Sequence, residues 1–189
     1  MKIIEGLEQG TEDWRKFRQN HVGASDASIC MHLNPWRTRN QLWEEKVLGW
    51  TQELNANMAR GQMMEEFARA AYEKEVGFLV MPMVAEHDTM PYLSASFDGL
   101  SINLKHAVEI KCGKASHKLA EKGEIPVYYM AQLQHQMYIG NLEKIDYFSF
   151  DGKDGILIPV KRDDFFIEEM IDKELEFWYC VTHLTPPQD

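Results

Sequence analysis

Two charged residues interrupt a short apolar stretch near the middle of the sequence, Val108-Glu-Ile-Lys-Cys112. Side chains alternate between the two faces of a β-strand, so Glu109 and Lys111 are expected to share one face and the apolar residues the other. The preceding stretch ends at Asp98-Gly99, with ten residues between Asp98 and Glu109. A short turn through residues 101–105 would pair the two strands antiparallel and bring Asp98 close to Glu109.

Two carboxylates held close together repel each other unless a cation or a proton neutralises them. Mg²⁺ is commonly bound by one or two carboxylates together with phosphate oxygens of a substrate. A neighbouring lysine such as Lys111 can hold a water molecule or neutralise charge that develops on a phosphate. The set Asp98, Glu109 and Lys111 therefore predicts hydrolysis of a phosphodiester. The alternative reading of the pentapeptide by itself is a half-exposed strand with two solvated charges.

Composition limits the classes of protein that are consistent with this chain. With 189 residues and an apolar fraction of 44%, one globular domain is expected. No apolar run is long enough for a membrane span, and no signal peptide is recognisable. Three widely separated cysteines predict reduced thiols in a cytoplasm. The net charge of −10 argues against general nucleic-acid binding but leaves room for a local basic groove.

The chain divides into a mainly helical part over residues 1–77, a catalytic sheet with helices over 78–160, and a C-terminal helix over 163–183. The helices are expected after a cap at Thr11, from a cap at Ser25 to about 34, and at about 38–48, 56–76, 114–122, 127–140 and 163–182. The strands are expected at 78–86, 92–97, 106–112, 144–150 and 155–160, with Asp151-Gly152 as a hairpin turn. This order predicts an α/β domain with a mixed central β-sheet flanked by helices.

Several ordered motifs resemble one family of nucleases. The spacing of Asp98, Glu109 and Lys111 resembles the PD-(D/E)xK motif, with ten residues between the first two and one residue between the last two. The other matching segments are Trp14 to Arg18, Gly23 to Ala27, Asn34 to Thr38, Met58 to Glu65, Ser94 to Gly99 and Gln132 to Tyr138. Together they resemble the lambda exonuclease and YqaJ-type viral recombinase branch over nearly the whole chain. Phe97 stands where that family usually has proline, which changes a backbone constraint but removes no ligand.

The resemblance implies a restriction-endonuclease-like core and a two-metal site. The implied metal ligands are Asp98, Glu109, the backbone carbonyl of Ile110 and, as an outer carboxylate, Glu65. Lys111 would position or activate the attacking water. Gln134 is expected to be the glutamine that reaches the active site. His135 is expected to be exposed.

The resemblance also implies DNA contacts at the edge of the site. Arg18 and Ser25 match the family's pocket for a terminal 5′-phosphate, and this chemistry suits an arginine beside a hydroxyl. Arg37 and Arg39 are expected to contact the DNA further along. Lys114, Lys118 and Lys122 lie four residues apart, and a stripe of this kind indicates either a polyanion contact or a plain solvated face.

The implied activity is that of a Mg²⁺-dependent 5′→3′ exonuclease on linear double-stranded DNA, with two Mg²⁺ per site and Mn²⁺ as a possible substitute. It would release 5′-mononucleotides and leave a 3′ single strand. The resemblance implies a homotrimeric ring, a phage single-strand annealing protein as partner, and a phage or prophage origin in a bacterial cytoplasm. Two alternatives stay open, a structure-selective or site-specific endonuclease on the same fold, and an inert scaffold that binds DNA ends.

Overall fold

The computed structural model describes residues 1–49 and 56–188, and only the backbone of residues 56–60 and 62. Within these residues the centre is a seven-stranded sheet in the order β1-β3-β4-β5-β6-β7, with β2 paired to β4. The strands are β1 (Lys2–Ile3), β2 (Val22–Gly23), β3 (Met81–Glu86), β4 (Leu93–Leu100), β5 (Ala107–Lys111), β6 (Lys144–Phe150) and β7 (Gly155–Lys161). The β5–β6 and β2–β4 pairs are parallel and the others antiparallel, so the predicted mixed sheet is confirmed.

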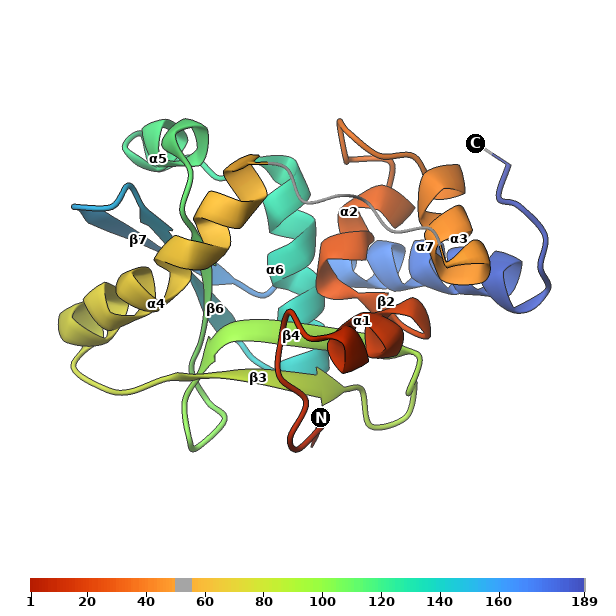
Figure 1. Ribbon diagram of the computed structural model, residues 1–189, viewed down its shortest axis with the longest axis horizontal. Helices are drawn as coiled ribbons and strands as arrows, with labels where there is room; N and C mark the ends of the chain where they lie inside the picture. Colours follow the sequence, from red (N-terminus) through yellow and green to blue (C-terminus); the bar gives the residue numbers. More distant parts are fainter. Residues whose placement is uncertain (50–55, 189) are drawn as a thin grey trace.

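The helices follow the predicted order closely (Figure 1). They are α1 (Glu12–Gln19), the 3₁₀ turn η1 (Ala24–Asp26), α2 (Ala27–Cys30), α3 (Arg39–Leu48), α4 (Ala56–Val76), α5 (Lys114–Ala120), α6 (Val127–Gly140) and α7 (Asp164–Thr182). Thr11, Thr38 and Asp163 cap α1, α3 and α7 through their side chains. Ser25 was expected to cap a helix and does not, because it lies inside η1, where Gly23 holds the cap position.

Two hydrophobic layers sandwich the sheet. On one face, Ala68 and Tyr72 of α4 pack with Val108, Ile110 and other apolar residues of the strands. On the opposite face, α6 and α7 pack against the sheet through a cluster that includes Leu133, Phe97, Tyr147 and Phe177. Since side chains alternate along β5, the face that holds Glu109 and Lys111 is the one that α6 covers.

The register between β3 and β4 is irregular next to Asp98. Met83 pairs with Phe97 and Met81 with Leu100, so two steps along β3 face three steps along β4. An extra residue of this kind is a β-bulge, a feature that often redirects a side chain beside an active site. Gly99 is required in the bulge, because a Cβ there would lie 2.5 Å from Val80 Cγ2 and 2.7 Å from Val108 Cγ1.

The N-terminal helices and α7 gather at one end of the molecule, and α4, α5 and β7 lie at the other (Figure 1). The sequence left open whether the last helix packs in the core, and it does: Ile167, Met170 and Phe177 of α7 are buried. None of the helices in the described ranges has the length and hydropathy of a transmembrane span. Cys30, Cys112 and Cys180 are all free thiols.

Candidate active site

The adjoining parts of β4 and β5 bring the two predicted acidic ligands together. Gly99 lies opposite Val108, so the antiparallel pairing expected from the sequence is confirmed. Next to Gly99 in the bulge, Asp98 turns its carboxylate toward β5, and Oδ2 accepts a hydrogen bond from the Ile110 amide at 2.8 Å. The Asp98 carboxylate therefore lies beside the segment of β5 that carries Glu109.

Glu109 is only 2% exposed and is held by three side chains. Its Oε1 accepts hydrogen bonds from the Lys111 ammonium and, at 2.7 Å, from Gln132 Nε2. Its Oε2 accepts a hydrogen bond from Gln136 Nε2 at 2.6 Å, and the same nitrogen reaches the Ser96 carbonyl at 3.2 Å. Gln136 thereby ties the carboxylate of β5 to the backbone of β4.

The prediction that Gln134 reaches the active site is wrong. Its Nε2 donates to the Lys161 carbonyl at 2.9 Å, and its Oε1 accepts from the Asp163 amide at 2.9 Å. Two residues along an α-helix correspond to a rotation of about 200°, so Gln134 leaves the face that Gln132 and Gln136 share. The sequence held a signal for these two glutamines, because their i,i+4 spacing places them on one helix face.

Lys111 lies between the Glu109 carboxylate and the ring of Tyr129, with Nζ 4.7 Å from the ring centroid. Burial acts to lower the pKa of Lys111, but the Glu109 and Asp98 carboxylates outweigh it and raise this pKa. The raised pKa favours the ammonium form of Lys111. An ammonium ion in this place is suited to stabilise negative charge on a phosphate.

A third carboxylate, from α4, lies close to this pair. Burial raises the pKa of Glu65, and although Arg69 opposes this shift, the charge of Glu109 adds to it. Arg69 Nη2 contacts Glu65 Oε1 at 2.9 Å. Burial and then repulsion from Glu109 likewise raise the pKa of Asp98 well above its usual range. The three carboxylates thus create an environment that favours a bound cation.

The donor set fits a hard divalent cation that takes few protein ligands. Asp98 and Glu109 supply two carboxylates, and Mg²⁺ commonly completes its shell with water and phosphate oxygens. In the described part of the chain, no three His, Cys, Asp or Glu side chains are grouped closely enough to hold a metal ion. Glu65 is near the pair but bound to Arg69. Metal binding by Glu65 and by the Ile110 carbonyl therefore stays a prediction.

The structure also brings Arg18 and Ser25 together. Arg18 Nη2 donates to Ser25 Oγ at 2.9 Å and to Asp26 Oδ1 at 3.1 Å. The Arg18 side chain is 25% exposed and Ser25 is exposed, so both groups reach solvent at one place. Asp26 lies in the matching segment Gly23 to Ala27 but was given no role from the sequence. Its second partner, Lys46, was not recognised, because nothing local distinguishes it from a solvated charge.

The expectation that Arg39 contacts DNA is contradicted. Its side chain is 2% exposed, and Nη2 contacts Glu176 Oε1 of α7 at 3.0 Å. Arg37 is also committed within the protein, because Nη2 contacts Glu45 Oε2 at 2.7 Å and the side chain is 16% exposed. Arg37 thus binds to α3 and Arg39 links α3 to α7, so both guanidinium groups are engaged in ion pairs within the protein.

Lys114 and Lys118 are exposed on α5, the helix that follows the catalytic strand. Helix α5 ends at Ala120, so Lys122 lies in the following turn and the predicted stripe is shorter than expected. Contact of these lysines with DNA stays a prediction. The side chains of Met58 and Arg60, which belong to the matching segment on α4, lie outside the described residues.

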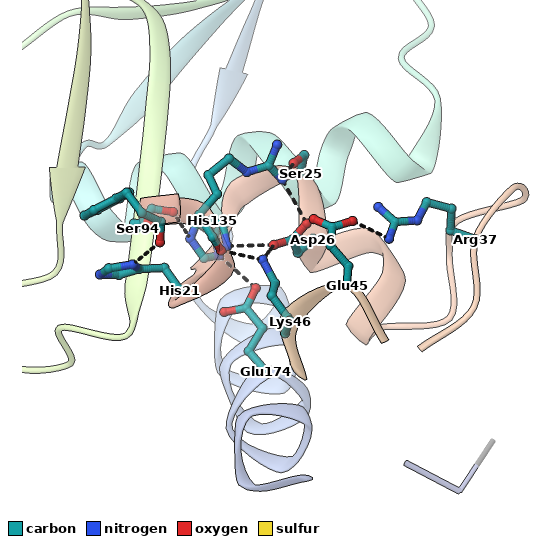
Figure 2. Close-up of polar contacts among 12 residues, drawn as sticks. His21, Ser25, Asp26, Arg37, Glu45, Lys46, Ser94, His135 and Glu174 are labelled. Carbon is teal, nitrogen blue, oxygen red and sulfur yellow. Dashed lines mark hydrogen bonds and ion pairs between the residues drawn. The ribbon is translucent and has the colours of Figure 1, made fainter. Parts of the chain in front are cut away.

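His135 is fully buried, contrary to the expectation that it is exposed. Its Nδ1 lies 2.8 Å from Glu174 Oε1 of α7, and its Nε2 lies 2.9 Å from the Ser94 carbonyl of β4 (Figure 2). The partner on α7 is 39 residues away in the sequence, so the local run of glutamines gave no indication of it. His135 therefore links α6 to both neighbouring layers.

Comparison with solved structures identifies the fold. The chain superimposes on an alkaline exonuclease, LHK-Exo, from Laribacter hongkongensis with a TM-score of 0.80 and 29% identity, covering 92% of this chain and 93% of that one. The structure of LHK-Exo in complex with dAMP gives a TM-score of 0.79 and 26% identity, with the same coverage of both chains. A phage-related exonuclease from Haemophilus somnus 129PT shares the fold, with a TM-score of 0.62 and 14% identity over 91% of this chain and all of that one.

Comparison of sequences gives the family. The protein YqaJ of Bacillus subtilis (strain 168), whose function is uncharacterised, is 27% identical over 93% of this chain and 58% of its own length. The chain thus spans less than two thirds of that relative. A family model described as the YqaJ-like viral recombinase domain matches residues 13–143. Together with the fold, these matches support a role in nuclease chemistry and recombination, and the chain belongs to the YqaJ-like viral recombinase domain family.

Proposed function

We propose that this protein is a Mg²⁺-dependent 5′→3′ exonuclease that degrades one strand of linear double-stranded DNA. The observation that carries the proposal is the meeting of Asp98, Glu109 and Lys111 where β4 adjoins β5, with Glu65 beside them. Two carboxylates with an ammonium ion between adjoining strands suit hydrolysis of a phosphodiester. The similarity to an alkaline exonuclease over most of the chain supports the same reading.

Asp98, Glu109 and the Ile110 carbonyl would hold two Mg²⁺ ions, or Mn²⁺ in their place, with Glu65 as the outer ligand. Bound Mg²⁺ supplies a polarised phosphate and a water of lowered pKa. The protein's own groups do the rest of the work. Gln132 and Gln136 fix the Glu109 carboxylate, and the Lys111 ammonium stabilises charge on the phosphate and orients the attacking water.

The polarity of the reaction would come from the Arg18 and Ser25 pair. A guanidinium beside a hydroxyl is well matched to a terminal phosphate. If the 5′-phosphate binds there while the first phosphodiester lies at the carboxylates, the product would be a 5′-mononucleotide and a 3′ single strand would remain. That LHK-Exo has been solved with dAMP, a nucleoside monophosphate, supports this choice of product.

The biological setting is proposed from the family alone. A recombinase domain that exposes a 3′ single strand would act with a phage single-strand annealing protein, in the cytoplasm of a bacterial host. A homotrimeric ring around the DNA would give processivity. Such a ring would also reconcile a net charge of −10 with DNA binding, if basic groups face its channel. Analytical ultracentrifugation would test the trimer.

The decisive experiment compares nucleotide release in Mg²⁺ from linear duplex with a 5′-phosphate, the same duplex with a 5′-hydroxyl, and closed circular duplex. Fast release from the first, slow release from the second and none from the circle are expected. Asp98→Ala is expected to abolish release while the thermal unfolding curve stays cooperative. Cutting of the circle would support an endonuclease instead. Tight binding of DNA ends without hydrolysis in Mg²⁺ or Mn²⁺ would support an inert scaffold.

A further inference from the structure

The Arg18 and Ser25 pair adjoins a buried carboxylate, Asp26, that has two cationic partners. Figure 2 shows Asp26 with Ser25 and Lys46 near it. Asp26 is 1% exposed, and the Lys46 side chain is 0% exposed. Lys46 Nζ contacts Asp26 Oδ2 at 2.8 Å, while Arg18 Nη2 contacts Asp26 Oδ1 at 3.1 Å. Each oxygen of the carboxylate therefore has its own cation, and only Arg18 reaches solvent.

The group formed by Arg18, Asp26 and Lys46 carries two positive charges and one negative charge. The ion pairs around it are complete, because Arg37 binds Glu45 and Arg39 binds Glu176. A charge excess in a largely buried cluster is unfavourable unless an anion compensates it. The excess positive charge therefore makes the exposed side of the cluster, at Arg18, a favourable site for an anion.

The neighbouring His135 and Glu174 do not change this balance. His135 Nε2 faces the Ser94 carbonyl, which only accepts, so this nitrogen carries a hydrogen. The 2.8 Å contact between Nδ1 and Glu174 Oε1 then needs one shared proton. Whether that proton resides on the imidazole or on the carboxyl group, the pair is neutral.

We propose that Lys46 determines the preference for a terminal phosphate by neutralising Asp26 from inside the protein. Without Lys46, Asp26 would neutralise Arg18, and an incoming phosphate would have to displace a buried carboxylate. With Lys46 present, the charge of Arg18 remains available. This inference rests on the proposed function, since it explains how the phosphate pocket of that function keeps its affinity.

The contacts of the two cations fit this division of roles. Lys46 Nζ is fixed by a second hydrogen bond, to the Arg18 carbonyl at 2.7 Å, and its burial prevents any contact with DNA. Arg18 uses Nη2 for Ser25 and Asp26, and in the described ranges no protein acceptor is bonded to its Nε or Nη1. Lys46 is thus a positioning residue, and Arg18 is the group that would touch the phosphate.

Four proteins test the proposal: the wild type, Lys46→Met, Asp26→Asn, and the double variant Asp26→Asn with Lys46→Met. The measured quantity is the preference for a 5′-phosphate over a 5′-hydroxyl, taken both as a ratio of hydrolysis rates and as a ratio of Kd for a short duplex without added metal. Lys46→Met is expected to reduce the preference at least tenfold, with little change in the rate on 5′-hydroxyl DNA. Asp26→Asn is expected to keep or increase it, because both cations are then free.

The double variant is the most informative of the four proteins, because it removes the charges of Asp26 and Lys46 and leaves the charge of Arg18 without a neutralising carboxylate. Its preference is expected to return to the wild-type value, which loss of packing at position 46 would not produce. Arg39→Met, which breaks another buried ion pair nearby, is the control and is expected to keep the preference. If Lys46→Met does not fold, Lys46→Gln, which also removes the charge but keeps a polar side chain, takes its place with the same expected loss of preference.

Full preference in a folded Lys46→Met variant, or loss of preference in the double variant, would overturn the role of Lys46. Absence of any preference in the wild type would instead overturn the phosphate pocket of the proposed function. The Kd ratio keeps the two failures separate, because it is measurable even if the protein hydrolyses no DNA.

Discussion

At the scale of single residues, the Glu109 carboxylate depends on amide groups that do not themselves titrate. Gln136→Ala removes the only described donor to Glu109 Oε2 and the bridge to Ser96. Loss of a group that orients a ligand typically costs about 10–100-fold in activity or metal affinity. We therefore expect kcat for nucleotide release to fall by a factor in that range, with the thermal unfolding temperature little changed.

Gln134→Ala is the matched comparison, since it truncates the same residue type two positions away. Gln134 bonds to the backbone at Lys161 and Asp163 and, at 3.8 Å, to Met130 Sδ, so its loss is expected to cost about 1 kcal/mol of unfolding free energy. The rate of hydrolysis by the folded protein should be unchanged. Equal losses of kcat in both variants would contradict the assignment of Gln136.

The alternation of β5 predicted correctly that Glu109 and Lys111 share a face, because strand geometry fixes that relation locally. The choice among three glutamines failed, because the rotation of α6 about its axis depends on how its apolar residues meet the sheet. Arg39 was misread for a similar reason. Its partner Glu176 is 137 residues away in the sequence, and no local pattern announces such a pair.

At the scale of secondary-structure elements, the bulge in β4 fixes the position of Asp98. Gly99→Ala would place a methyl group against Val80 and Val108 at distances that real Cβ atoms do not show. Overpacking of this kind costs about 1–3 kcal/mol, which urea unfolding would measure. Adding Val80→Ala to Gly99→Ala should recover part of the loss. Gly61→Ala in α4, where a Cβ would meet nothing, is expected to be neutral or stabilising.

The junction of α6, α7 and β4 at His135 is expected to make stability depend on pH. Burial acts to lower the pKa of His135, but Glu174 and further partners, Asp26 among them, raise it overall; burial raises the pKa of Glu174 itself. Both groups therefore hold protons more tightly in the folded than in the unfolded chain. Their contribution to stability is present at low pH and is lost as pH rises from the ordinary glutamate range through the raised pKa of His135.

Urea unfolding at pH 5.5 and pH 8 tests this expectation. The unfolding free energy of the wild type should fall between these values by more than that of Glu174→Gln, in which the amide can still donate to a neutral His135. A wild type that gains stability over this interval relative to the variant would contradict the assignment. The result bears on the position of the whole helix α6, because this helix carries Gln132 and Gln136 as well as His135.

At the scale of the whole molecule, the sequence predicted a sheet flanked by helices, but it did not predict how the N-terminal helical region attaches to the sheet. The order of strands and helices follows from local periodicity and turn residues, such as Asp151-Gly152 between β6 and β7. The short strands β1 and β2 were missed because two residues carry no periodic signal. They nonetheless attach the N-terminal region to β3 and β4, so that Arg18 is held in place beside the sheet.

Because the net charge is −10, the proposed binding of DNA would require a local group of cations. Lys114 and Lys118 are exposed on α5, which follows directly after the catalytic strand. Reversing both charges, with Lys114→Glu and Lys118→Glu, is expected to weaken binding of duplex DNA. If each lysine contacts one phosphate, the slope of log K against log salt should decrease by about 2.

Lys105 and Lys144 provide the matched control for this experiment. Both are exposed and lie at the opposite end of β5 and β6 from α5. Lys105→Glu with Lys144→Glu gives a protein of the same net charge, so any general repulsion of DNA is equal in the two variants. A smaller salt slope for the α5 variant alone would place the DNA over that end of the sheet. Equal slopes would mean that the two lysines belong to a solvated surface and that the path of the DNA lies elsewhere.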